Sequence, residues 1–229
     1  MNAPEQQDAL LIDDDSSIAQ RMVCRVSSVA IKAVFPFIAV DDVRYYLCGV
    51  NIRPLDDGTA MIIATDGARF VIIRDPKGYA ETEVVAHVCK DAIKHADNTT
   101  TFDVMNNGSV IWNDAVGTPV FVQPGKSVID GDFPRIESVC DTTGYHEGIK
   151  GAVNMNYLAD ALKIKIGSKA PALRFFSRDE DSPLLFMISG VGDVEIIGGI
   201  MKMREYSALP DWIPKGSDFS LMSDGKRKS

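Results

Sequence analysis

One order of elements, strand–helix–strand–strand–strand, occurs three times along this chain of 229 residues. The three repeats begin at Arg21, Glu83 and Ile149, so they follow one another at a spacing of roughly 60 residues. Few side chains match between the repeats, but the order of the elements does. Such a repeat indicates one building block used several times. It predicts an α+β fold in which three βαβββ units lay short helices against antiparallel sheet.

Turn residues mark the ends of the predicted strands. Asp57-Gly58, Asp66-Gly67 and Asn107-Gly108 each lie between runs rich in β-branched and aromatic residues. These dipeptides tolerate the positive φ of a tight turn and are strong hairpin signals. We therefore expect an antiparallel hairpin at each of the three positions.

The three predicted helices are short and begin near Ser28, Cys89 and Asn156. Only the third has a clear period of 3.6 residues, which places Leu162 on its apolar side. Pro36 lies inside the first candidate helix, where a proline removes a backbone donor. We expect that helix to kink or to end early.

Composition favours a soluble, cytoplasmic protein. The chain is 45% hydrophobic, yet no apolar run approaches the roughly 18 residues that span a membrane. The N-terminus has no apolar signal segment. The 4 cysteines lack CxxC spacing, which favours buried free thiols over disulfides or a metal site.

The sequence lacks the motifs of enzyme chemistry. Its 3 histidines form no HxH or HExxH arrangement, and there is no GxSxG elbow, Walker loop or GxGxxG after a strand. Asp66 beside Gly67 could be read as a catalytic aspartate, but a turn residue is the better interpretation. We expect a binding or scaffold protein with no catalytic residue, no metal and no cofactor.

The two ends of the chain, residues 1–20 and 206–229, are interpreted as tails. The acidic run Asp13–Asp15 is more typical of a solvated segment than of a metal site. The basic end, Lys226–Lys228, could touch nucleic acid, but a frayed terminus is the preferred interpretation.

Five segments, in order, resemble the bacterial DNA polymerase III beta subunit, the sliding clamp. The segments DVRYYLCGVNI (from Asp42), IIATDGARFVII (from Ile62) and GDFPRIESV (from Gly131) are similar to the middle domain of that family. The segments AVNMNYLADAL (from Ala152) and GGIMKMR (from Gly198) are similar to the end of its third domain. Each motif alone is modest, but their order and spacing make the match specific.

The resemblance implies the DNA-clamp fold and a division into domains. Residues 21–140 would form a full clamp domain, and residues 141–205 half of another. The family's first domain and the first half of its third domain have no counterpart. A clamp ring resembles twelve half-domain units around a hole, so three repeats per chain would require four chains. Adjacent chains would then have to flip, or some sheet edges would stay unpaired, and we expect a homo-oligomer or a partner to cover them.

The resemblance also implies a function. The protein would be a sliding-clamp-like processivity factor that tethers a DNA polymerase, and receives a clamp loader, through short hydrophobic peptide motifs. The family's peptide-binding pocket carries over onto Leu47, Thr65, Gly67, Arg69, Phe70, Pro134, Val139, Asn154, Tyr157, Ile200, Met201, Met203 and Arg204. In this pocket Leu47 and Phe70 would form the floor, and Arg69 and Arg204 a polar rim. The chain departs from the family pattern at Ala68, Ser138 and Lys202, where the family has His, Arg and Pro.

Binding to double-stranded DNA is expected to be independent of sequence. The net charge is −8 and the pI about 4.9, so the chain as a whole should be repelled by phosphate. Clamps meet this conflict with basic helices inside an acidic ring. The corresponding lysines here are Lys32, Lys90, Lys94, Lys163, Lys165 and Lys169.

A second interpretation comes from a different class of protein. The chain could be an interaction protein that binds clamp-seeking motifs in the pocket and regulates or competes with replication proteins, without encircling DNA. Oligomeric state discriminates the two, because a closed ring of defined mass supports the clamp and a monomer supports the pocket protein.

Overall fold

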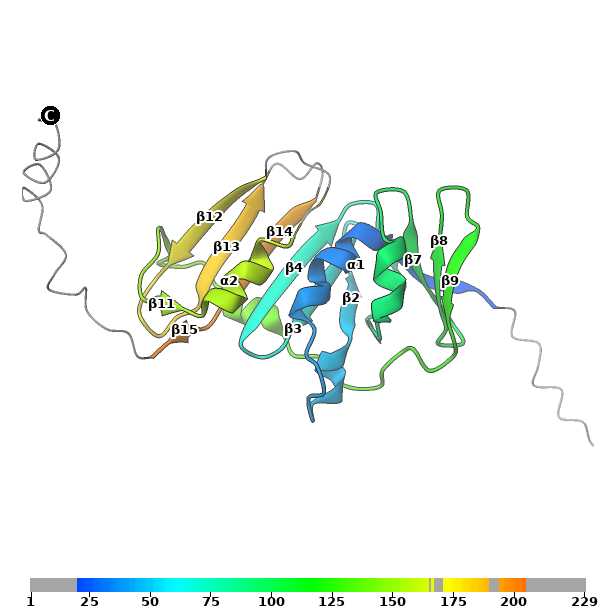
Figure 1. Ribbon diagram of the computed structural model, residues 1–229, viewed down its shortest axis with the longest axis horizontal. Helices are drawn as coiled ribbons and strands as arrows, with labels where there is room; N and C mark the ends of the chain where they lie inside the picture. Colours follow the sequence, from blue (N-terminus) through cyan, green and yellow to red (C-terminus); the bar gives the residue numbers. More distant parts are fainter. Residues whose placement is uncertain (1–19, 165, 167–170, 190–193, 205–229) are drawn as a thin grey trace, which may run out of the picture.

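The computed structural model describes residues 20–164, 166, 171–189 and 194–204. These residues form an elongated body built from two main sheets, with residues 20 and 204 at its opposite ends (Figure 1). No helix in the described ranges is long and apolar enough to cross a membrane.

One sheet has five strands, in the order β5-β1-β7-β8-β9. Its strands are β5 (Tyr79–Ala80), β1 (Met22–Ser27), β7 (Thr101–Met105), β8 (Val110–Asn113) and β9 (Pro119–Gln123). The other main sheet has eight strands, in the order β10-β12-β13-β14-β4-β3-β2-β6. Its strands are β10 (His146–Glu147), β12 (Ala172–Ser177), β13 (Leu184–Ser189), β14 (Glu195–Ile200), β4 (Arg69–Asp75), β3 (Ala60–Thr65), β2 (Val50–Pro54) and β6 (Val84–Ala86). A small sheet pairs β11 (Ala152–Val153) with β15 (Lys202–Met203). All the pairings are antiparallel.

The first two repeats exchange their leading strands. Strand β1, which opens the first repeat, pairs with β7 of the second repeat. Strand β6, which opens the second repeat, pairs in return with β2 of the first. The two repeats are therefore held together by a reciprocal exchange of strands.

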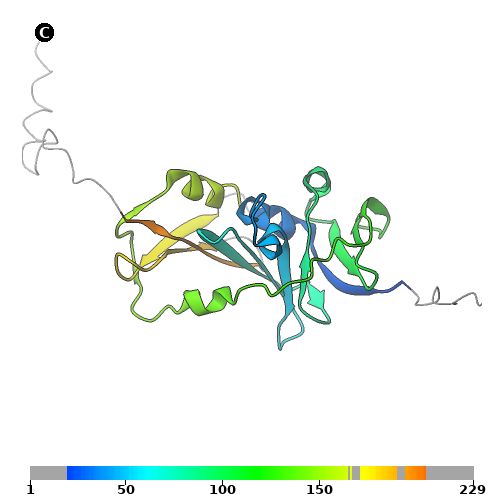
Figure 2. The same ribbon diagram turned by 90° about the horizontal axis from the view of Figure 1, so that it is seen from below.

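Helix α1 (Ser28–Val34) follows β1 directly and buries Ser28, Ala30, Ile31, Ala33 and Val34. It continues as the 3-10 helix η1 (Phe35–Phe37), where Pro36 occupies the first turn. The other short helices are η2 (Tyr45–Cys48), η3 (Lys90–His95), η4 (Ile136–Cys140) and α2 (Met155–Ala161). Figure 2 shows α1, η3 and α2 on one side of the sheets and η4 on the other.

Strands β4 and β14 join the first repeat to the third. They pair along six residues each, Arg69–Arg74 against Glu195–Ile200, although about 120 positions of sequence separate them. Because β3 and β13 lie outside this pair, the first and third repeats share one continuous sheet.

Two glycines in β14 leave room for two aromatic rings that lie against the sheet. Gly198 lies directly opposite Phe186, and Gly199 lies directly opposite Phe70. A Cβ added to Gly198 would stand 2.1 Å from the Phe186 ring, and one added to Gly199 would stand 2.3 Å from the Phe70 ring. Each ring therefore covers bare backbone, one on each face of the sheet, which is a known way to compensate for glycine in strands.

The eight-stranded sheet buries apolar side chains on both of its faces. The helix-side core includes Ile31, Phe37, Val71, Phe186 and Ile200. The outer cluster, on the opposite face, consists of Ala39, Leu47, Ile63, Phe70, Ile72, Val85, Phe133, Ile136 and Leu185. The segment from Phe133 to Cys140 covers this outer face and connects the second repeat to the third.

The threefold element order is confirmed, as is the α+β fold with short helices on antiparallel sheet. The helices begin at Ser28, Lys90 and Met155, within a residue of the predicted starts, although the second is 3-10 rather than α. Leu162 differs from expectation, since it is exposed because α2 ends at Ala161. The predicted division near residue 140 stays a prediction.

Filling the space at Gly198 should destabilise the fold. Gly198→Ala puts a methyl group into a Phe186 ring that is itself fully buried and packs against Phe37, so we expect a loss of about 1–3 kcal/mol in the free energy of unfolding. Urea denaturation followed by circular dichroism measures it. Gly125→Ala is the matched control, because its Cβ would lie 3.4 Å from its nearest neighbour. Equal stability of the two variants would contradict the close packing at Gly198.

Candidate peptide-binding and DNA-facing surfaces

The turn between β3 and β4 is held by its own side chains. The Thr65 hydroxyl donates to the Arg69 carbonyl at 2.7 Å and accepts from the Gly67 amide at 3.0 Å. The Asp66 carboxylate accepts from the amides of Ala68 and Arg69 at 2.9 and 3.0 Å. Gly67 has φ of +89°, which a side chain would strain. Asp66 is therefore a turn residue, as the sequence predicts.

Arg69 ties this turn to helix α2 of the third repeat. Its guanidinium donates to Asp66 at 3.0 Å and also pairs with Asp160 of α2. It stacks on Tyr157, with 4.8 Å from the guanidinium carbon to the ring centroid, and on Phe37 at 5.3 Å. A further bond runs to the carbonyl of Pro36 at 2.9 Å.

The guanidinium of Arg69 thus makes ion pairs, ring contacts and a bond to a backbone carbonyl, and its side chain is only 12% exposed. We expected it at the polar rim of a peptide groove, but the structure uses it to bind two repeats together. Asp160, one of its partners, carries no signal in the sequence, because its contact with Arg69 depends on the β4–β14 pairing.

Asp160 is a carboxylate held in its charged form. Desolvation alone would raise its pKa, but hydrogen bonds from Lys163 and Arg69, together with their positive charges, outweigh that effect and lower the pKa below its ordinary value. The ion pair at Arg69 is therefore formed at neutral pH and depends on Asp160 staying ionised.

Several of the residues carried over for the pocket lie near this junction, but on two faces of the sheet. Leu47 and Phe70 lie almost fully buried in the outer cluster. Ile200 lies in the helix-side core, and Tyr157 packs against that core. The structure therefore makes Leu47, Phe70 and Ile200 part of the packed interior.

The exposed apolar atoms at the junction belong to the end of the third repeat. Met201 is 44% and Met203 49% exposed, and Arg204 is also exposed. The Met201 amide donates to the Ala68 carbonyl at 2.8 Å, which places Met201 beside the β3–β4 turn, and Met203 pairs with Ala152 in the small sheet. Val139, at the end of η4, is 39% exposed.

Asn154 and Pro134 have structural surroundings of their own. Asn154 caps α2, because its side chain accepts from the Asn156 amide at 2.9 Å. Pro134 lines a cavity of about 750 Å³ between β6 and the segment 128–135. That cavity has Glu83, Asp130 and Asp132 on its walls and was not anticipated from the sequence.

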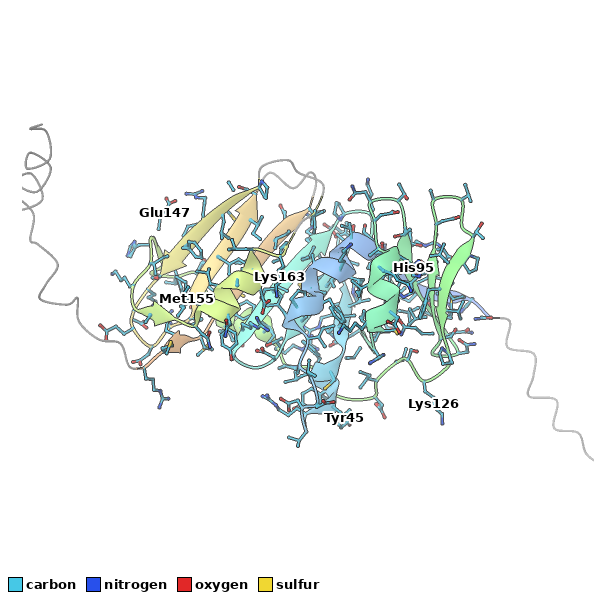
Figure 3. The ribbon with its side chains drawn as sticks, in the orientation of Figure 1. Tyr45, His95, Lys126, Glu147, Met155 and Lys163 are labelled. Carbon is cyan, nitrogen blue, oxygen red and sulfur yellow. The ribbon has the colours of Figure 1, made fainter. Side chains whose placement is uncertain are left out.

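The lysines expected to face DNA lie on the helix side of the sheets. Lys32 on α1, Lys90 and Lys94 on η3, and Lys163 after α2 are all exposed. Lys163 is paired with Asp160, so its charge is partly neutralised. Lys165 and Lys169 lie outside the described residues. Figure 3 labels Lys163 in front of the sheet, on the same side as α1.

The cysteines and the side chains that could bind a metal ion bear on the expectations about disulfides and metal sites. None of the four cysteines, all of which the structure describes, forms a disulfide. Cys24 is buried, and burial raises the pKa of its thiol to about 12. Within the described ranges, no three His, Cys, Asp or Glu side chains are grouped to hold a metal ion.

Removing the charge of Asp160 should weaken the fold in a pH-dependent way. Because the folded pKa lies below the unfolded value of about 3.9, ionised Asp160 stabilises the folded state above roughly pH 4, and this contribution is lost as pH falls through the folded pKa. Asp160→Asn should therefore lower the free energy of unfolding by about 1–3 kcal/mol at pH 7. The difference from the unsubstituted protein should shrink as pH falls below roughly 4.

Urea denaturation at pH 7 and at pH 3 measures both effects. Asp91→Asn, an exposed carboxylate on η3, serves as the control and should change stability by less than about 0.5 kcal/mol. A gap between Asp160→Asn and the unsubstituted protein that is the same at both pH values would contradict the role given to this carboxylate.

Comparison with known proteins finds similarity in structure but not in sequence. No family model and no curated protein matches the chain significantly. Among solved structures, the DNA polymerase sliding clamp from Pseudomonas aeruginosa matches with a TM-score of 0.58 and 16% identity, over 80% of this chain and 67% of that one. The beta clamp of H. pylori in complex with diflunisal matches with a TM-score of 0.58 and 13% identity, over 81% of this chain and 67% of that one.

The DNA polymerase sliding clamp from Bacillus subtilis gives a TM-score of 0.55 and 15% identity, over 81% of this chain and 65% of that one. This chain thus spans about two thirds of the length of each of these proteins. The threefold repeat, the paired sheets and the helices on one side of them are together the fold of the bacterial DNA polymerase III beta sliding clamps.

Proposed function

We propose that this chain is a sliding-clamp-like processivity factor, a non-enzymatic protein that holds a DNA polymerase and a clamp loader on duplex DNA. The single observation that carries the proposal is the arrangement of α1, η3 and α2 on one side of the sheets of a clamp fold (Figure 2). A surface of that kind, repeated around a ring, would present every helix to the DNA at the centre.

The charges support weak contact with phosphate. The chain carries a net charge of −8, while Lys32, Lys90 and Lys94 are exposed on the helix side. Contacts of this kind hold any sequence equally, because they reach only the DNA backbone. A closed ring makes weak contacts sufficient, since it cannot leave the DNA sideways and still slides.

The peptide-binding part of the proposal centres on Met201 and Met203. Methionine side chains are flexible and adapt to apolar partners, and both lie exposed at the end of the third repeat, Met201 beside the β3–β4 turn. A short motif of the Gln-x-x-Leu-x-Phe kind would lay its apolar side chains against them, with Arg204 at the rim. Leu47 and Phe70 would support this surface from below.

The alternative function, a pocket-only protein that binds the same motifs without encircling DNA, is favoured by one observation. The net charge is acidic, and Lys163, the lysine that the structure describes next to α2, is paired with Asp160. Encirclement of DNA decides between the two functions.

Truncating an exposed methionine should weaken peptide binding. Met203→Ala removes apolar contact area from the surface, so we expect the dissociation constant of a fluorescent Gln-x-x-Leu-x-Phe peptide to rise roughly tenfold. Fluorescence anisotropy measures it. Val116→Ala, which shortens another exposed apolar side chain in the distant β8–β9 turn, is the control. Unchanged affinity in Met203→Ala would remove this surface from the proposal.

A protein ring that encircles circular DNA should slide off once the DNA is cut into a linear molecule. The protein is incubated with nicked circular plasmid, a bacterial clamp loader and ATP, and the bound fraction is isolated in high salt, where phosphate contacts are screened. Cutting the plasmid once with a restriction enzyme should then free most of the retained protein.

A mock digestion without enzyme is the control, because it leaves the circle intact. Equal retention on cut and uncut plasmid, or no retention in high salt, would contradict encirclement. Peptide binding that persists in either case would favour the pocket-only function.

A further inference from the structure

The third repeat has no second repeat in this chain with which to exchange a leading strand, whereas the first two repeats exchange theirs with each other. Within the chain, each of those repeats sends its leading strand to the other, β1 to β7 and β6 to β2. The leading segment of the third repeat, residues 146–153, instead turns back onto its own repeat. It contributes β10 to the edge of β12, and β11 to β15.

The edge of β12 is only partly covered by this segment. His146 and Glu147 pair with Ser177 and Phe176, and the Gly148 amide reaches the Phe175 carbonyl at 2.8 Å. Among the described residues, no strand pairs with positions 172–174 on that side. Figure 1 shows β12 at one end of the molecule, so the open edge faces outward. Exposed sheet edges of this kind pair readily with another strand.

Two glycines allow the leading segment to turn back. Gly148 has φ of +123° and Gly151 has φ of +83°, both in the region that strains other residues. A straight strand, such as β1 or β6 in the exchanged pair, needs no such residues. The segment can therefore turn back because glycine occupies these two positions.

Helix α2 of the third repeat is also less buried than helix α1 of the first. Helix α1 buries five of its seven residues, whereas α2, of the same length, buries only Ala161. Met155 at the start of α2 is 82% exposed. Figure 3 shows Met155 and Glu147 toward the same outer end of the molecule. The apolar surface that a second repeat covers at α1 is thus left open at α2.

The open edge carries one positive and one negative side chain, so the same edge of a second copy would be complementary to it. Arg174 on β12 donates to Glu147 on β10 through two bonds of 3.1 and 3.0 Å, and both side chains are about half exposed. If two copies exchanged their leading segments, each Arg174 would meet the Glu147 of the other copy. A twofold contact repeats every such pair twice.

We propose that two copies of this chain join through their third repeats by exchanging residues 146–153, in a twofold contact that rebuilds the missing domain. The contact specifies the homo-oligomer of the proposed function, but its basis is strand order, burial and charge, without reference to DNA. It also answers the difficulty of three repeats per chain. Neighbouring repeats alternate in orientation, and a twofold contact at one end lets two chains join without breaking that alternation.

The test uses two charge reversals, Glu147→Arg and Arg174→Glu, and measures mass in solution by light scattering, without DNA. The unsubstituted chain has a mass of 25.0 kDa, and its particle should have at least twice that mass. Each variant alone has like charges at positions 147 and 174, both in its turned-back segment and in an exchanged dimer of identical copies, so exchange brings it no matched pair. An equimolar mixture of the two should dimerise at least roughly tenfold more tightly than either variant alone, because in the mixed dimer every Glu meets an Arg of the other copy.

Tighter dimerisation on mixing is diagnostic, since the pair within one chain stays mismatched in both variants and only exchange between them matches it. Circular dichroism of each variant alone checks that it is folded. An unsubstituted protein of 25.0 kDa would overturn the proposal. A mixture that dimerises no more tightly than the separate variants would overturn it too, because that is the behaviour of a dimer joined through another edge, such as β9. The plasmid experiment is independent, because it reports encirclement and not which edge pairs.

A second variant acts in the opposite direction. Gly148→Ala strains the turned-back segment through its positive φ, while its added Cβ meets no atom within 4 Å. It should therefore favour exchange and raise the dimerisation constant at least roughly fivefold. An unchanged or lowered constant in this variant would contradict the exchange of this segment.

Discussion

The pairing of β4 with β14 is the interaction on which the rest of the structure depends. It brings the first and third repeats into one sheet, although about 120 positions of sequence lie between the two strands. Every other contact at the junction follows from it. The two rings lie over Gly198 and Gly199 because that register sets them opposite, and Arg69 reaches Asp160 and Tyr157 because α2 is then held above the sheet. Closing so long a loop is unfavourable, which explains why the junction carries both close packing and an ion pair.

The junction also limits what the candidate peptide surface can be. Phe70 fills the space over Gly199, and Arg69 is sandwiched between two aromatic rings, so both support the sheet and neither is free to meet a ligand. In the proposed function, the part left for binding is the exposed pair Met201 and Met203. A surface that rests on a packed interior would be rigid from beneath, and the two methionines would supply the adaptability that varied partners require.

Local signals in the sequence predicted the elements well but could not predict their partners. Asp66 and Gly67 specify a tight turn by their own chemistry, and Pro36 ends α1 by lacking a donor, so both were evident from neighbouring residues. The β4–β14 register was not, because an alternating apolar strand fits many edges equally well. The role of Arg69 was missed for the same reason, since Asp160 lies 91 positions away. The Gly198-Gly199 doublet was the one available sign, because glycine inside a strand often marks close approach of another group.

Residue-resolved amide hydrogen exchange tests the shared sheet most directly. In β4 the alternation of an antiparallel strand points the amides of Phe70 and Ile72 toward β14, and those of Val71 and Ile73 toward β3. If the first and third repeats form one cooperative sheet, both sets should exchange only with global unfolding and show the same free energy of opening. Rapid exchange at Phe70 and Ile72, with Val71 and Ile73 still protected, would show that the third repeat separates on its own and would contradict the account.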